Sequence, residues 1–167
     1  MPEKTNKREF LSRFEGVVDC QRRLAIPKPW RFDSDPEDLS FFLCLGVGPS
    51  LELFEYEEFE KRQIQMAAKR GTPDFEYLAT AVSMYSTTVK IDKQGRITIP
   101  QHMLLAAKIT TKVVCIGSTA FGSIYAPEIW AQRDPGTEKV IDFILSLRSP
   151  STTVTQTETK VLVTETQ

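Results

Sequence analysis

A short pattern that occurs twice constrains the fold of this chain more than any other feature. In one copy, Val89 to Pro100, two apolar segments flank a charged Asp-Lys-Gln-Gly-Arg turn, and a proline ends the second segment. Gly95 suits the positive φ of a tight turn, and Pro100 cannot donate to a sheet ladder. The stretch therefore predicts a hairpin with a charged tip. Val17 to Pro27 matches it at an offset of 73 residues, which indicates an internal repeat.

The repeat continues after the two turns. The apolar segment 43–46 aligns with 114–117 at an offset of 71 residues, and both segments end in glycine. Return segments follow, and then Phe59 aligns with Trp130 at the start of a helical pattern. Each half therefore predicts a hairpin, an apolar strand, a return strand and a helix. We expect an α+β fold in which both halves share one topology.

The repeat also predicts the domain organisation. The expected parts are a flexible N-terminus at 1–12, a first module at 13–71, a connecting helix at 72–85, a second module at 86–148 and a disordered tail at 149–167. Modules of this size bury little surface alone, so we expect them to share a core or to oligomerise. The tail is rich in Thr, Gln and Glu. A single added edge strand within it is the alternative.

Composition indicates an ordinary globular chain of 167 residues, of which 41% are hydrophobic. No run approaches the length of a membrane span, and the charged N-terminus lacks a following apolar signal region. We therefore expect a cytoplasmic protein with no membrane partner. Cys20, Cys44 and Cys115 form no C-x-x-C pair, so we interpret them as reduced thiols, mostly in the core.

The net charge of −1 hides an uneven distribution. Residues 1–31 carry eight basic against four acidic side chains, whereas residues 33–60 carry nine acidic side chains and no base. This segregation permits a local positive surface on a weakly acidic protein. It also permits the opposite outcome, because an acidic segment that shares the face of the turns would repel DNA.

Together these features resemble the MraZ family, which belongs to the SpoVT/AbrB-like superfamily of swapped-hairpin DNA-binding proteins. The resemblance rests on two copies of Asp-x-x-(Gly/Arg)-Arg-apolar-x-Ile-Pro, each followed by the strands and by a Glu-x-aromatic helix. It covers about residues 14–148. It implies two pseudo-symmetric swapped-hairpin (AbrB-like) β-barrel modules with flanking helices, assembled into a ring-shaped homo-oligomer.

The resemblance also implies a function. It predicts a nucleoid-associated transcriptional regulator that binds direct repeats in double-stranded promoter DNA, controls division and cell-wall genes, and needs no cofactor. The second half lacks an arginine expected after Pro100, so the first half is predicted to make most of the contacts. The implied DNA-binding residues are Arg22, Arg23, Lys28, Arg31, Lys93 and Arg96.

Two alternatives stay open. Arg23 and Arg96 could instead be structural, each tied to the aspartate of its own turn, Asp19 or Asp92. The whole protein could likewise be a protein-interaction module on the same scaffold with little affinity for DNA.

Other candidate sites favour structural interpretations. The chain has one histidine, His102, and no cysteine cluster, so we expect neither a metal site nor a Cys-His catalytic pair. Phe59 and Trp130 are predicted to be core anchors. The glutamates of residues 57–60 lie where a helix begins, so their charges would complement the helix dipole. We therefore predict no enzymatic activity.

Overall fold

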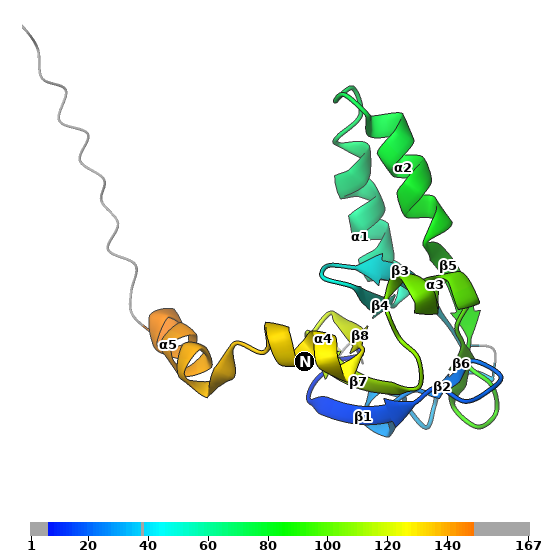
Figure 1. Ribbon diagram of the computed structural model, residues 1–167, viewed down its shortest axis with the longest axis vertical. Coiled ribbons are helices and arrows are strands. Elements are labelled where there is room, and N and C mark those ends of the chain that lie inside the picture. Colours follow the sequence, from blue (N-terminus) through cyan, green and yellow to red (C-terminus); the bar gives the residue numbers. More distant parts are fainter. Residues whose placement is uncertain (1–6, 38, 149–167) are drawn as a thin grey trace, which may run out of the picture. The chain divides into compact units, whose positions relative to one another are not determined.

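The computed structural model describes residues 7–37 and 39–148 and has a mixed α+β architecture (Figure 1). A six-stranded antiparallel sheet and a separate two-stranded sheet are accompanied by five α-helices and one 3-10 helix in the described residues. The elements are β1 Arg13–Val17, β2 Arg23–Ala25, η1 Lys28–Trp30, β3 Ser40–Gly46, β4 Ser50–Phe54, α1 Tyr56–Ala67, α2 Phe75–Met84, β5 Ser86–Lys90, β6 Arg96–Thr98, α3 Gln101–Ala106, β7 Lys112–Gly117, β8 Phe121–Tyr125, α4 Pro127–Arg133 and α5 Gly136–Arg148.

Both halves of the repeat contribute strands to the larger sheet. Its order is β1-β7-β8-β4-β3-β5, so strands from the two halves lie next to each other at β1–β7, at β4–β8 and at β3–β5. The predicted pairs of apolar and return strands are confirmed as the antiparallel pairs β3–β4 and β7–β8. Within the described residues the sheet is open rather than closed into a barrel, since β1 and β5 lie at its edges.

The two turns form as predicted, but the strands that flank each turn pair mainly with other strands rather than with each other. β1 pairs with β7 and β5 pairs with β3, and the pairing across the first turn is limited to a bridge between Val18 and Leu24. The second strands, β2 and β6, pair antiparallel with each other. The reason is burial: Leu24, Ile26, Ile97 and Ile99 on these segments are at most 2% exposed and join one core. Figure 1 shows the two short strands next to each other.

The N-terminal segment differs from the predicted flexibility in the part that the structure describes. Residues 1–6 lie outside the described residues, but Phe10 is fully buried and exchanges backbone hydrogen bonds with Thr119. Arg8 is 4% exposed, and its guanidinium donates to Asp35, to Glu55 and to the Trp30 carbonyl at 2.7 Å each. A buried arginine is tolerated here because both carboxylates compensate its charge.

The Arg8 cluster predicts a specific dependence of stability on pH. Burial raises the pKa of Asp35, but hydrogen bonds from Arg8 and from the Phe32 N–H outweigh it and hold that pKa below 3.8. Folding therefore gains stability from the Asp35 carboxylate above about pH 4 and loses it as the pH falls through the lower folded-state pKa. In thermal unfolding between about pH 7 and pH 2, Asp35→Asn should destabilise the protein most at neutral pH. A difference from the unsubstituted protein that stayed constant with pH would contradict this account.

The cysteines and the paired aromatic residues only partly match the core prediction. Cys115 is buried, which raises the pKa of its thiol to about 12. Cys44 is half-buried, whereas Cys20 is exposed in the first turn. Phe59 stacks on Phe42 with ring centroids 4.0 Å apart, and Trp130 lies 5.4 Å from the Tyr125 ring. Both residues are half-buried, so they anchor helices on the sheet rather than fill its centre.

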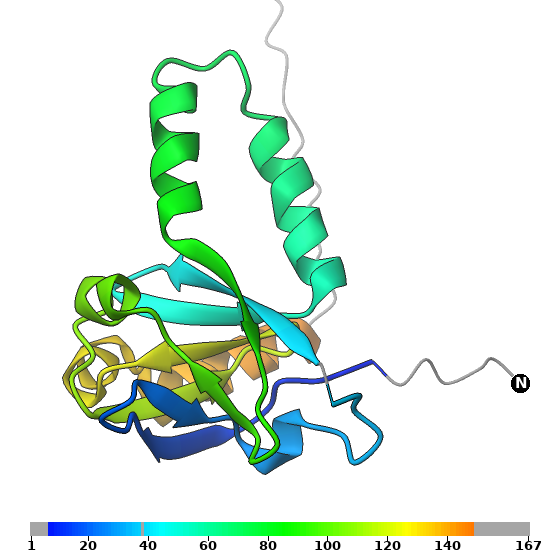
Figure 2. The same cartoon turned by 90° about the vertical axis from the view of Figure 1, so that its right-hand side faces the viewer.

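Several helices carry exposed apolar side chains. α1 and α2 form a helical hairpin that projects from the sheet (Figure 2). Ile64, Tyr77 and Leu78 on this hairpin are 66%, 76% and 56% exposed. α5 belongs to a separate compact unit that begins at Asp134, and its apolar residues, Phe143 among them, are also exposed. The predicted tail, 149–167, lies outside the described residues.

Candidate nucleic-acid interface

Asp19 organises the first charged turn. One carboxylate oxygen accepts hydrogen bonds from the backbone N–H groups of Gln21 and Arg23, at 2.9 Å each. The other oxygen lies 2.7 Å from both Nε and Nη2 of Arg23. These hydrogen bonds lower the pKa of Asp19, and the bond from the Arg23 backbone N–H contributes most. The aspartate is therefore ionised at neutral pH and holds the turn through backbone and side chain together.

The second turn repeats this arrangement around Asp92. Its carboxylate accepts from the N–H groups of Gln94 and Arg96 at 2.9 and 3.0 Å, and it lies 2.9 Å from Arg96 Nε and 2.8 Å from Nη2. Slight burial raises the pKa of Asp92, but the hydrogen bonds from Arg96 outweigh it, so the pKa is lowered. In each turn the geometry is that of the structural alternative, in which the arginine is tied to its own aspartate.

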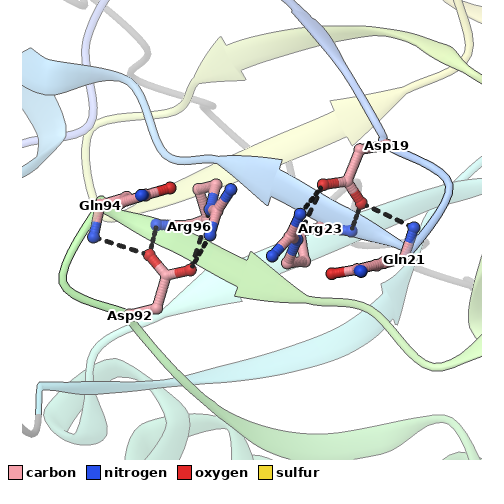
Figure 3. A network of polar contacts seen from close by, with 6 residues as sticks. All are labelled: Asp19, Gln21, Arg23, Asp92, Gln94 and Arg96. Atoms are coloured by element: carbon pink, nitrogen blue, oxygen red, sulfur yellow. Dashed lines mark hydrogen bonds and ion pairs between the residues drawn. The ribbon is translucent and has the colours of Figure 1, made fainter.

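The two turns lie at opposite ends of the two-stranded sheet, because the strands that follow them pair antiparallel with each other (Figure 3). The N–H of Ile26 donates to the Gly95 carbonyl, and the N–H of Ile99 donates to the Arg22 carbonyl, both at 2.9 Å. Each turn is thus fixed to the strand end of the other half. The result is one rigid surface with two charged tips related by pseudo-twofold symmetry.

The turns differ at their tips. Arg22 has φ +63° and Gly95 has φ +77°, so the first turn places a side chain in the left-handed region that glycine adopts without strain. Arg22 is exposed, whereas Gly95 is buried. The backbone hydrogen bonds that Arg22 shares with Asp19 and Ile99 hold it in this conformation.

The structure gives the predicted site residues three different surroundings. Arg22, Lys28 and Lys93 are exposed. Arg23 and Arg96 are half-buried in ion pairs with Asp19 and Asp92. The third kind is Arg31, whose Nε donates to the Ile26 carbonyl at 3.1 Å and whose guanidinium lies against Gly95. Because Arg31 and Gly95 belong to different halves of the sequence, only the fold brings them together.

Other candidate chemistry does not converge on this surface. His102 is exposed on α3, where its Nε2 lies 3.1 Å from the Met84 carbonyl oxygen. Within residues 7–37 and 39–148, no group of three or more His, Cys, Asp or Glu side chains is arranged to hold a metal ion. No helix in the same ranges is both long and apolar enough to cross a membrane. The feature that sequence reasoning missed is Arg8, since its polar context gave no sign of burial beyond the neighbouring Phe10.

The sequence of the chain is similar to sequences of known proteins. Residues 84–134, which contain the second turn, match the family model described as "MraZ protein, putative antitoxin-like". A "Transcriptional regulator MraZ" from Corynebacterium glutamicum is 30% identical over 132 residues, covering 77% of this chain and 89% of that protein. Proteins of the same name from Caldanaerobacter subterraneus subsp. tengcongensis and Thermomicrobium roseum are 28% and 27% identical, covering 77% and 73% of this chain and 89% and 84% of those proteins. The chain belongs to the MraZ family.

Proposed function

We propose that this protein is a sequence-specific DNA-binding transcriptional regulator of the MraZ type. Its two AbrB-like repeats, 13–71 and 86–148, would interlock as swapped hairpins and present the charged turns to promoter direct repeats. The regulated genes would be those of division and cell-wall synthesis, and the protein would act in the cytoplasm on the nucleoid. The proposed activity is binding, with no catalytic step and no cofactor.

The observation that carries this proposal is the matched pair of preorganised turns. Both are locked by an aspartate that accepts two backbone N–H bonds and a bidentate arginine, and each is tied to the other half. A rigid surface binds with little loss of conformational freedom. Exposed cations at its tips can position phosphates, and an arginine can read guanine in the major groove.

The proposal divides five of the six predicted site residues by role. The direct contacts are Arg22 and Lys93 at the turn tips. Lys28, which follows Pro27, is the third direct contact. Arg23 and Arg96 primarily shape the turns, and their charges add to the local positive potential.

The charge of one subunit is too small for tight binding, because salt steeply weakens a complex with few phosphate contacts. The exposed apolar side chains of α1, α2 and α5 support self-association, since such surfaces mark interaction sites. A ring of identical subunits would place turn surfaces on successive direct repeats and raise the affinity by multivalency. Size-exclusion chromatography with light scattering measures the oligomer directly.

Arg22→Gly tests the proposed function because it separates folding from DNA binding. Glycine removes the strain of a side chain at φ +63°, so the variant should unfold with a free energy about 1 kcal/mol higher than that of the unsubstituted protein. It also removes an exposed cation, so its affinity for promoter DNA should fall at least about tenfold. Fluorescence anisotropy and thermal unfolding measure the two effects.

Lys69→Ala is the matched control, because it removes an exposed cation just beyond α1 and away from the turns. Its DNA affinity should stay within about twofold of the unsubstituted protein. A more stable Arg22→Gly variant that binds DNA with unchanged affinity would overturn the assignment of the first turn.

One observation keeps the protein-interaction alternative in view. A cavity of about 290 Å³ beside the second turn brings the acidic side chains of Asp35 and Glu37 close to Lys93. However, several acids of the segment 33–60 are used internally: Asp35 and Glu55 pair with Arg8, and Glu52 pairs with Arg62. The acidic segment therefore leaves less unbalanced negative charge than its sequence suggests, which favours DNA binding. An interaction module would show no DNA affinity even at low salt.

A further inference from the structure

The side chain of Arg31 belongs to the first repeat but lies on the turn of the second. Arg31 follows η1, and its Nε donates to the Ile26 carbonyl at 3.1 Å. A Cβ atom added to Gly95 would overlap Nη1 and Cζ of Arg31 and would lie 3.0 Å from Nη2. The guanidinium therefore rests directly on the Gly95 backbone, where a side chain of residue 95 would begin. This contact agrees with the burial of Gly95.

Backbone hydrogen bonds fix this arrangement from both sides. The N–H of Ile26 donates to the Gly95 carbonyl at 2.9 Å, and the carbonyl of Ile26 accepts from Arg31. Ile26 thus holds both the second turn and Arg31, which covers that turn. A guanidinium held this way loses little side-chain freedom when it binds a phosphate or a base edge.

The first turn shows the complementary arrangement. The position equivalent to Gly95 is Arg22, which carries its own exposed side chain. The position equivalent to Arg31 at the same offset is Leu104, which is 4% exposed and belongs to the core. Each turn therefore has one arginine at its residue of positive φ. In the first turn this arginine is Arg22 itself, and in the second turn it is Arg31, which contacts Gly95 from the other repeat.

We propose that Arg31 is the DNA-contacting arginine of the second turn and that Gly95 is a specificity-determining residue because only glycine leaves room for that guanidinium. This proposal rests on the proposed DNA-binding function. It supplies the second half with the arginine that its own sequence lacks after Pro100. It also predicts that Gly95 and Arg31 act as one unit in binding, although 64 positions separate them in the sequence.

A double-mutant cycle tests the proposal with the full chain and the DNA that co-purifies with it. Arg31→Ala and Gly95→Ala should each weaken binding about tenfold, the second because it displaces the guanidinium. The double variant should also bind about tenfold more weakly, and not a hundredfold, because the same contact is lost once. Arg31→Gln can still donate to the Ile26 carbonyl but lacks the charge. It should bind as weakly as Arg31→Ala, with a reduced salt dependence.

Three results would count against the proposal. Additive losses in the double variant would show that Gly95 and Arg31 act separately. Full binding by Arg31→Gln would show a structural role without DNA contact. Unchanged binding by Arg31→Ala, in a protein whose unsubstituted form binds DNA, would overturn this inference alone. The absence of DNA binding by the unsubstituted protein would instead overturn the proposed function, while a thermal-unfolding cycle on the same variants would still report the contact between Arg31 and Gly95.

Discussion

Replacing Arg22 and Lys93 together with alanine is expected to weaken promoter binding about a thousandfold. The double variant removes one exposed cation from the tip of each turn. If two subunits engage the DNA, four contacts are lost, and at about 1 kcal/mol each this corresponds to roughly three powers of ten. Both side chains are exposed, so the fold and the oligomer should not change.

Electrophoretic mobility shift titration at fixed salt measures this loss, and light scattering checks the oligomer. The matched control is Lys61→Ala with Lys69→Ala, which removes the same charge from exposed positions on and just beyond α1. The control should lose less than about threefold in affinity. Equal losses in the two double variants would mean that total charge, rather than the turn surface, determines binding.

Arg8→Ala should lower the free energy of unfolding by about 3 kcal/mol, the largest stability effect expected from a single substitution here. The change leaves Asp35 without its charged partner and the Trp30 carbonyl without its Arg8 donor, in a site where the Arg8 side chain is 3% exposed. It also removes a cation that lies 4.6 Å from the centroid of the Phe32 ring. Removal of one partner from a buried ion pair costs roughly 3–5 kcal/mol, and Glu55, which is 34% exposed, places the expectation at the lower end.

Thermal unfolding at constant protein concentration measures this effect, with an expected decrease in Tm of roughly 6–12 °C. Arg13→Ala serves as the control, because Arg13 is 55% exposed and lies 3.7 Å from Glu15. Its change should stay within about 0.5 kcal/mol. An Arg8→Ala variant as stable as this control would show that the buried cluster contributes little to the fold.

Sequence patterns predicted the local elements well because those elements depend on neighbouring residues. The alternation of apolar residues and the glycine and proline positions located β3, β4, β7 and β8, and the repeat correctly indicated matching turns at Asp19 and Asp92. The structural alternative for Arg23 and Arg96 could be stated in advance, since an aspartate four residues before an arginine is a local feature.

The remaining features depend on contacts between distant residues. The same alternation is consistent with a local hairpin or with an exchanged pair, and only the shared burial of Leu24 and Ile97 decides for the pairing of β2 with β6. The burial of Arg8 depends on carboxylates 27 and 47 residues away. The contact of Arg31 with Gly95 likewise appears only when both halves are folded together.

The central claim is that the paired turns form a DNA-binding surface, and the salt dependence of binding to double-stranded DNA tests it most directly. Anisotropy titrations of the full chain between about 50 and 300 mM salt should give a binding constant that falls linearly on logarithmic axes. For the unsubstituted protein the slope should be about −4 or steeper. The double variant Arg22→Ala with Lys93→Ala should have a clearly shallower slope. No measurable binding at 50 mM salt, or a slope that the double variant leaves unchanged, would contradict the account.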